Sequence, residues 1–424
     1  MLDIRRIRTE PDAVKAALAK RGVDGTQIDA LLELDVERRK RVTEAESIKA
    51  AQNKLGPQIA QAKKAGEDAS ALLEESTRLK TAFVEAEEAQ KSLDEQQDAI
   101  LFGMPNTPLD DVPAGGEENN VELRGANREL RTFDFEPKAH WDIGANLGLF
   151  DTECGAKLTG SGFVVYKGLG ARLQRALVAL MLDLHTQKHG YTEVGVPFLL
   201  NTASITASAH IVKFKPEMYH DAESDLYLVP TAEPALVNLH REELLEPGQL
   251  PLKYVAHTPC WRREAGAAGR DTRGLLRVHQ FDKVEIFRYV APETSQEAQV
   301  EMVEEACAVL DALELPHRLL LLAAGDTSFA MARTVDVEVW APGVGKWLEV
   351  SSASDGTDFQ ARRGNIRFRR EAGAKPEFCH LLNASGTALP RVVAALLETH
   401  QNADGTVTVP VALRPYLGGV EKLG

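Results

Sequence analysis

Two proline-poor segments near the start of the chain repeat apolar residues every seven positions. Residues 69–101 contain neither proline nor glycine, and Pro57 is the single proline of residues 27–64. The repeating positions are Leu72, Leu79, Ala86, Leu93 and Ile100 in the later segment, and Ile48, Leu55 and Ala62 in the earlier one, with Ala45 and Ile59 alongside. This spacing is typical of the seam of a coiled coil.

The two segments are joined by the polar turn KKAGEDAS. Two helices joined by so short a turn must run antiparallel, and each would be about 50 Å long at ~1.5 Å per residue. A hairpin of that length cannot form a globular core, so we expect it to project. We also expect Gly56-Pro57 to kink the first helix, because proline removes a helical hydrogen bond.

The commoner role of such a hairpin is a spacer or a dimerisation arm. The chain has a formal net charge of −14, which argues against coating nucleic acid through bulk charge. A partner that meets a few placed basic residues remains possible. The basic residues of the hairpin are Arg38, Arg39, Lys40, Arg41, Lys49, Lys54, Lys63, Lys64, Arg78 and Lys80. Interspersed acids prevent the assignment of single phosphate contacts.

A proline- and glycine-bearing linker, residues 102–120, separates the hairpin from the rest of the chain. The four cysteines are far apart with no CxxC, so neither a disulfide framework nor a zinc site is expected. No apolar run approaches the length of a membrane span, and the N-terminus lacks the apolar core of a signal peptide. These features predict a cytoplasmic protein with no membrane partner.

The stretch from Thr258 to Arg288 carries seven Lys/Arg against four Asp/Glu. A local positive cluster in an acidic chain indicates an anionic ligand. The flanking β-type runs predict a hairpin with strands near 253–262 and 275–290. The alternative is a surface hairpin whose arginines pair with neighbouring acids.

Strand side chains alternate faces, so Arg262 and Glu264 should share one face, as should Phe281 and Glu285. The second pair is about 13 Å apart at ~3.3 Å per residue. One strand would then offer an aromatic face to a flat ring and a carboxylate to a cationic group.

The wording of this stretch, TPCWRREAGAAGRDTRGLLRVHQFDKVE, resembles motif 2 of class II aminoacyl-tRNA synthetases, in the version found in seryl-tRNA synthetases. The resemblance implies that Arg262 binds the α-phosphate of ATP and Glu264 the adenine end. Phe281 would stack on adenine, and backbone near Val278 would hydrogen-bond the ring. Arg263 belongs to the same ATP-binding stretch, although the family leaves its side chain free.

Two further segments resemble the family. GTALPRVVAALLE, residues 386–398, is similar to motif 3, a strand turning into a helix, and Arg391 would cover adenine and reach the tail phosphates. WLEVSSASDGTDFQARR, residues 347–363, is similar to the segment that contributes the ATP-binding residues Glu349, Val350, Ser351 and Ser352. Glu349 and Ser352 would hold Mg²⁺ on the phosphates, because few oxygen ligands shared with substrate suit that ion. The implied catalytic residues are Arg262, Glu264 and Arg391.

The resemblance also implies a serine site. Thr231, Ala232 and Glu233 follow the strand DLYLVP, and alternation would put Thr231 and Glu233 on one face. The remaining members are Glu285, Asn383 and Ser385. Two carboxylates would take the ammonium and the hydroxyl of serine. Alanine would be rejected because, without the hydroxyl, buried polar groups stay unpaired.

The family fold is α+β, an antiparallel sheet with flanking helices behind a two-helix coiled-coil arm. The resemblance implies a tRNA-binding domain at 1–108, with its arm at about 27–101, and a catalytic domain at 109–424. The helix near 172–189 and the strand GYTEVGVPFLL are similar to motif 1, which builds the homodimer interface. The implied enzyme activates L-serine with ATP and transfers it to tRNA(Ser), and also to tRNA(Sec).

One segment departs from the sequence pattern of the family. Where the family reads close to G-T-G-Q-L-P-K-F, this chain has ASAHIVKF, residues 207–214, with Ala207 and Ala209 in place of glycines. Alanine adopts glycine conformations only at a cost, so the loop should stiffen. Two other functions remain open: a serine-activating paralogue that loads a carrier protein, and a non-catalytic coiled-coil scaffold that binds nucleotide.

Overall fold

A computed structural model describes residues 1–265 and 273–424 of the chain. The chain divides into two compact units by its internal contacts. The first comprises Met1–Ala19 and Val23–Pro105, and the second comprises Lys20–Gly22 and Asn106–Gly424. The division of function at residues 108 and 109 stays a prediction.

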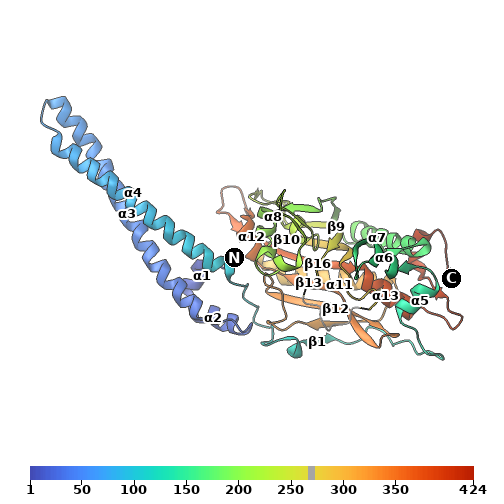
Figure 1. Cartoon of the computed structure of the whole chain (residues 1–424). Helices are drawn as coiled ribbons and strands as arrows, with labels where there is room; N and C mark the ends of the chain where they lie inside the picture. Colours follow the sequence, from blue (N-terminus) through green and yellow to red (C-terminus); the bar gives the residue numbers. More distant parts are fainter. Residues whose placement is uncertain (266–272) are drawn as a thin grey trace. The chain divides into compact units, whose positions relative to one another are not determined.

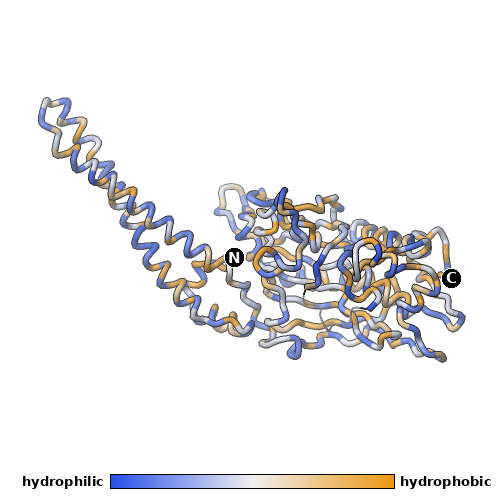
Figure 2. The backbone as a smooth tube through the Cα atoms, in the orientation of Figure 1, coloured by the Kyte–Doolittle hydropathy of each residue, from blue (hydrophilic) through white to orange (hydrophobic). Residues whose placement is uncertain are grey.

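The first unit is entirely helical. Its helices are α1 (Ile4–Thr9), α2 (Pro11–Ala19), α3 (Thr26–Ala65) and α4 (Ser70–Gly103). Helices α3 and α4 lie side by side as a long hairpin (Figure 1), which confirms the predicted coiled-coil arm. All ten residues of the predicted seam are buried or half-buried, and hydrophilic residues are frequent elsewhere along the hairpin (Figure 2). Helix α3 continues through Pro57 without a break.

A buried carboxylate ties the base of the arm together. Asp35 of α3 is 1% exposed and accepts hydrogen bonds from Arg8 at 2.6 and 2.8 Å. Gln97 of α4 and Arg39 donate to the same carboxylate at 3.2 and 3.1 Å. Burial acts to raise the pKa of Asp35, but these partners reverse that effect, and the net pKa lies below its ordinary value.

The second unit is built on an eight-stranded sheet with the order β1-β11-β12-β13-β16-β10-β9-β4. All neighbours pair antiparallel except β4 and β9, which confirms the predicted α+β fold with an antiparallel sheet. The strands are β1 (Val121–Arg124), β4 (Thr192–Glu193), β9 (Leu252–Trp261), β10 (Gln280–Val290), β11 (His317–Leu321), β12 (Arg333–Ala341), β13 (Lys346–Asp355) and β16 (His380–Ala388).

Alternation along β10 divides the core between the two faces of the sheet. Val284 and Ile286 belong to one apolar cluster, which packs against α7 (Gly168–Gln187), α11 (Ser295–Ala312) and α13 (Leu389–Thr399). Phe287 and Tyr289 belong to a second cluster. That cluster includes residues of α8 (Thr202–Ala207), α10 (Glu233–Val237) and α12 (Phe359–Gly364). The apolar face of α7 is buried and comprises Leu173, Leu177, Leu180, Met181 and Leu184.

Short elements complete the second unit. The helices are α5 (His140–Asn146), α6 (Thr152–Thr159) and α9 (His210–Lys213), with 3-10 turns η1 (Glu117–Asn119), η2 (Lys215–Glu217), η3 (Pro292–Thr294), η4 (Val411–Leu413) and η5 (Pro415–Leu417). The strands are β2 (Phe150–Asp151), β3 (Val165–Tyr166), β5 (Leu199–Asn201), β6 (His220–Asp221), β7 (Leu226–Leu228), β8 (Leu244–Leu245), β14 (Arg367–Phe368), β15 (Glu377–Phe378), β17 (Val407–Thr408) and β18 (Lys422–Leu423).

Two predicted strands differ from the structure. The second strand of the motif 2 hairpin begins at Gln280 rather than 275, because Gly274 turns at φ 67° and the Leu275 N–H bonds to His140 instead of a strand. The segment GYTEVGVPFLL forms β4 and β5 rather than one strand, since Pro197 between them lacks a donor.

Among the residues that the structure describes, no helix combines the length and the apolar character needed to span a lipid bilayer.

We predict that Asp35→Ala destabilises the first unit by about 1–3 kcal/mol at pH 7, because Arg8 and Gln97 lose their shared acceptor. Since the folded pKa of Asp35 is lowered, its contribution is present above its unfolded pKa and fades as pH falls through the folded value. Hydrogen exchange of α3 and α4 peptides at pH 7 and pH 3 would measure both effects. Glu46→Ala, at an exposed site of α3, is the control; equal protection in both variants would contradict the prediction.

Candidate functional site

A polar cleft of about 1040 Å³ opens in the second unit. Thr231, Glu233, Asn383 and Ser385 line it, as do Glu349 and Ser352. Arg262 also lines the cleft and exerts an electrostatic effect on both Glu233 and Glu349. Side chains from distant parts of the sequence therefore share one space, and the cleft contains members of both predicted subsites.

The β9–β10 hairpin places Arg262 beside Phe281. Arg262 follows the last residue of β9, and its N–H donates to the His279 carbonyl at 2.9 Å. Its guanidinium carbon lies 5.3 Å from the centre of the Phe281 ring, and its Nε donates to the Pro230 carbonyl at 3.3 Å. A cation and an aromatic face thus lie together at the end of the hairpin.

Arg263 and Glu264 lie beyond the end of β9. Glu264 has a φ of 49° and its carboxylate pairs with Arg277. The guanidinium carbon of Arg263 lies 5.9 Å from the centre of the Tyr219 ring. The expectation that strand alternation places Arg262 and Glu264 on one face is wrong, because the strand ends at Trp261. Neither Arg263 nor Glu264 is among the residues that line the cleft.

Arg391 lies in the first turn of α13, the helix of the predicted motif 3. Strand β16 turns directly into α13, whose first turn contains Pro390 and Arg391, which matches the predicted strand-to-helix pattern. Arg391 donates to the carbonyls of Glu349 and Leu276 at 2.7 and 3.2 Å, and its guanidinium lies 3.4 Å from the Glu349 carboxylate. Motif 3 therefore holds both Glu349 and the segment that leads to Val278, which is buried.

Glu349, Ser352 and Asp336 form an oxygen-rich cluster in the cleft. Ser352 Oγ donates to Asp336 at 2.5 Å and lies 3.3 Å from Glu349. Burial acts to raise the pKa of Glu349, but Arg391 and Arg262 bring its net pKa below the ordinary value. Burial, followed by the charge of Glu349, raises the pKa of Asp336 well above its usual range.

These hard oxygen donors suit Mg²⁺ better than zinc. The carboxylate of Glu349 and the hydroxyl of Ser352 fit a cation that draws its other ligands from a phosphate, because both line the cleft and lie 3.3 Å apart. Among the described residues, no group of three or more His, Cys, Asp or Glu side chains could hold a metal alone.

Glu285 is fully buried and pairs with a buried lysine. Lys283 Nζ lies 2.7 Å from Glu285 Oε2, and the two side chains are 7% and 0% exposed. Thr231 Oγ1 donates to Glu285 at 3.4 Å, and Asn383 Nδ2 donates to it at 3.1 Å. All three neighbours therefore hold the carboxylate in place, and two of them are predicted serine-site residues.

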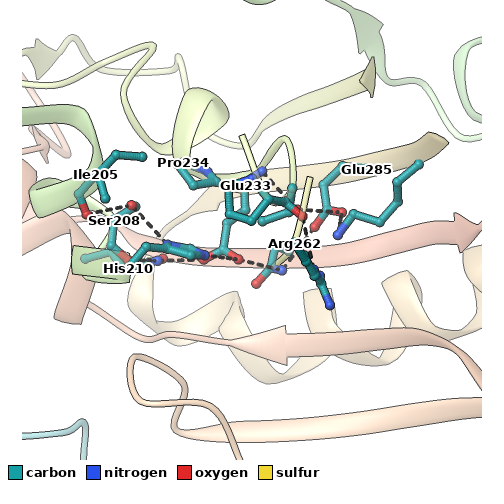
Figure 3. A network of polar contacts seen from close by, with 12 residues as sticks. Ile205, Ser208, His210, Glu233, Pro234, Arg262 and Glu285 are labelled. Atoms are coloured by element: carbon teal, nitrogen blue, oxygen red, sulfur yellow. Dashed lines mark hydrogen bonds and ion pairs between the residues drawn. The ribbon is translucent and has the colours of Figure 1, made fainter. Parts of the chain in front are cut away.

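Glu233 joins this network from the first residue of α10 (Figure 3). Gln360 donates to its Oε1 at 2.7 Å and Asn383 to its Oε2 at 3.3 Å. His210 Nε2 lies 3.8 Å from the same Oε2. Burial, followed by the nearby charge of Glu285, raises the pKa of Glu233 to about 7.

Thr231 and Glu233 meet in the cleft for a different reason from the one predicted. Strand β7 ends at Leu228, and Glu233 begins a short helix, so strand alternation does not apply. The Glu233 N–H donates to Thr231 Oγ1 at 3.3 Å, and this turn holds both side chains together. Ala232 between them is fully buried.

Two β-bulges lie beside the candidate site residues Ser385 and Glu349 and set the directions of their side chains. The β10–β16 register shifts between Val284 and Glu285, which leaves Gly386 as an extra residue beside Ser385. The β12–β13 register shifts at Val350, next to Glu349. Ser351 Oγ donates to the Ser385 carbonyl at 2.5 Å and connects the two bulged strands. Val350 and Ser351 are both 1% exposed, so their side chains belong to the interior.

Sequence reasoning did not include four side chains of this site. Lys283 was detectable, because it shares a strand face with Glu285 two residues later. Gln360 lies in the segment FQARR, whose resemblance was noted without assigning it a role. Asp336 is an acid within the apolar strand RTVDVEVW and gives no local signal. His210 lies in residues 207–214, the segment that departs from the sequence pattern of the family.

The departure at 207–214 has a definite conformation. Ala209 adopts φ 69° and ψ 1°, the left-handed region that favours glycine, and is 3% exposed. Ala207 ends α8 without a positive φ. The expected cost of replacing glycine therefore applies to Ala209 and not to Ala207.

Two family models match the chain. The seryl-tRNA synthetase N-terminal domain matches residues 1–108, and the class II tRNA synthetase core domain (G, H, P, S and T) matches residues 213–400. A serine–tRNA ligase from Gemmatimonas aurantiaca is 49% identical over 99% of both chains. The serine–tRNA ligase of Listeria welshimeri is 47% identical over 100% of this chain and 99% of its own.

Solved structures agree with these relatives. The seryl-tRNA synthetase of Pyrococcus horikoshii, complexed with ATP, superposes with a TM-score of 0.94 at 36% identity, covering 100% of this chain and 99% of its own. The cytoplasmic serine–tRNA ligase of Naegleria fowleri, in complex with AMP, has a TM-score of 0.90 at 27% identity, covering 100% and 98%.

We predict that Gly386→Ala lowers the stability of the second unit by about 1–3 kcal/mol through overpacking. A Cβ atom there would lie 2.9 Å from His185 Nε2 and 3.2 Å from a methyl group of Val284, and His185 is fully buried. Gly195→Ala is the matched control, because its Cβ meets nothing within 4 Å. Thermal unfolding would compare the two, and equal midpoints would exclude a steric requirement for glycine in the bulge.

Proposed function

The chain belongs to the seryl-tRNA synthetase family, and we propose that its cleft joins L-serine to ATP and then transfers the serine to tRNA. One observation supports this most strongly: the buried carboxylate of Glu233 lines a cleft with Arg262 and Glu349, and Asn383 links it to a second buried carboxylate, Glu285. An amino acid and a nucleotide phosphate require those opposite charges close together. The relatives carry the ligase name over their full length, which favours neither a carrier-loading paralogue nor a non-catalytic scaffold.

The serine end would recognise its substrate by charge and hydrogen bonding. We propose that Glu233 accepts the ammonium group and that Glu285, with Thr231, Asn383 and Ser385, receives the hydroxyl. Lys283 neutralises Glu285 in the absence of ligand, so Glu285 is held for hydrogen bonding without competing for the ammonium. Alanine would leave these groups unpaired, which is the basis of strong discrimination in a buried polar site. Ala232 contributes backbone.

The ATP end would align the α-phosphate with the serine carboxylate. Phosphoryl transfer needs positioning and positive charge where negative charge accumulates. We propose Arg262 for the α-phosphate, Phe281 and Arg391 for the two faces of adenine, and Glu264 with backbone near Val278 for the ring edge. Arg391 now pairs with Glu349, so ATP binding would exchange that contact for phosphate. For Arg263, Val350 and Ser351 we propose only backbone or supporting roles.

We propose that Glu349 and Ser352 hold Mg²⁺ together with the ATP phosphates. Asp336 supports Ser352 by accepting a hydrogen bond from its hydroxyl group. The ion would neutralise charge on the phosphate oxygens. The carboxylates of Asp336 and Glu349 orient the hydroxyl of Ser352 by accepting its hydrogen bonds. Arg391 keeps the pKa of Glu349 low enough for this carboxylate to remain ionised.

We propose that the α3–α4 arm grips tRNA(Ser), and tRNA(Sec) where it is present, and that the enzyme is a homodimer through its motif 1 region. The N-terminal family model covers the arm, and basic residues occur on both helices. A long arm suits a tRNA with a long extra stem.

We predict that Glu285→Ala lowers the kcat/KM for serine at least about 100-fold, because it removes a substrate contact and leaves Lys283 buried without a partner, a loss of about 3 kcal/mol or more. Serine-dependent exchange of pyrophosphate into ATP measures this step without tRNA. Glu297→Ala, at an exposed site of α11, is the control. Unchanged kinetics in Glu285→Ala would remove this residue from the site.

We predict that deletion of residues 27–101, with a short linker in their place, spares pyrophosphate exchange and abolishes tRNA charging. The first unit has its own contacts, and the cleft is lined by residues of the second unit. The two assays on the same preparation provide the comparison. Equal loss of both activities would refute this division of labour.

A further inference from the structure

His210 occupies a position beside the serine pocket that its hydrogen bonds restrict to one tautomer. Ser208 Oγ donates its proton to the Ile205 carbonyl at 3.1 Å. The same oxygen lies 3.0 Å from His210 Nδ1 and can therefore only accept there. His210 Nδ1 must carry a proton, so in the neutral ring Nε2 presents a lone pair.

That lone pair faces a carboxylate. His210 Nε2 lies 3.8 Å from Glu233 Oε2, and the two side chains are 14% and 9% exposed (Figure 3). Glu233 Oε1 accepts from Gln360 at 2.7 Å, whereas Oε2 receives only the longer bond from Asn383. Two acceptors that face each other in a largely dry site repel unless a proton lies between them. The geometry therefore calls for one proton on the His210–Glu233 pair.

The surrounding charges favour the carboxyl as the holder of that proton. The charged groups that act on the pair are Glu285, Lys283 and Arg262, and Lys213 of α9 lines the same cleft. Burial, with Arg262 and Lys283 as further causes, lowers the pKa of His210 to about 4, and burial with Glu285 raises that of Glu233 to about 7. In the described part of the chain, Glu233 forms no salt bridge with a lysine or arginine.

We propose that His210 is a positioning residue that shares one proton with Glu233 and thereby sets the pH range in which the pocket accepts the ammonium group of serine. This rests on the proposed assignment of Glu233 to that group. When serine binds, its ammonium replaces the proton at Glu233 Oε2, and the proton leaves to solvent. The left-handed Ala209 immediately before His210 fixes the ring over the pocket.

The test is the pH profile of the KM for serine, measured by pyrophosphate exchange at saturating ATP between pH 6 and 8.5. Because the ligand binds the ionised carboxylate, the KM should rise about tenfold from pH 8 to pH 6 if the pKa of Glu233 is about 7. In His210→Gln the amide donates to Oε2 and lowers the pKa of Glu233, so the rise should shrink to threefold or less. The KM for ATP should show no matching change in either protein.

Two further variants distinguish the effect of the shared proton on the pH profile from the effect of the loop conformation. Ser208→Ala removes the acceptor at Nδ1, so the ring can donate from Nε2 to Glu233, and the pH profile should flatten as in His210→Gln. Ala209→Gly relaxes the same turn but keeps both polar groups, so it should retain the tenfold rise. If His210→Gln and Ser208→Ala both keep that rise, burial alone controls Glu233 and the inference fails.

Failure of the proposed function would look different. If Glu233→Gln and Glu285→Ala leave the KM for serine unchanged at pH 8, the pocket does not bind serine. If those variants impair serine use while His210→Gln keeps the wild-type pH profile, only the role of His210 is overturned.

Discussion

Two carboxylates buried in one network, with a lysine paired to just one of them, impose the central constraint on this protein. Asn383 donates to both Glu233 and Glu285, while Lys283 pairs with Glu285. An ionised Glu233 is costly in such a place unless a cation or a proton compensates it. We therefore expect the pocket to favour a ligand that brings a positive charge and a hydroxyl together. The surrounding hydrogen-bond donors hold the acids in position until it arrives.

The sheet makes this arrangement possible because two of its central strands, β13 and β16, contain β-bulges. Gly386 and Val350 are extra residues in two strands that both flank the cleft. A bulge re-aims the side chains beside it, and here those side chains are Ser385 and Glu349. Arg391 then ties the end of β16 to β13 through Glu349. The binding surface thus depends on backbone irregularities that regular strands would not provide.

Sequence reasoning predicted the arm, the antiparallel core and some of the residues that line the cleft, and it erred in local detail. The heptads predicted α3 and α4 because a coiled-coil seam follows from local spacing. Strand alternation failed at Glu264 and Glu233, since each lies past a strand end whose position depends on tertiary partners. Leu275 shows this, as its N–H bonds to His140, which precedes it by 135 residues. Asp336 and His210 escaped notice because their importance comes from neighbours that only the fold brings together.

The uninterrupted heptad pairing of α3 and α4 has a consequence for how such an arm can change length. Removing or adding seven residues in each helix preserves the seam, so the hairpin can grow or shrink in steps of about 10 Å without redesign of its interior. Its length is therefore a modular property. Paired insertions of seven residues in each helix would change the reach of the arm and preserve its seam.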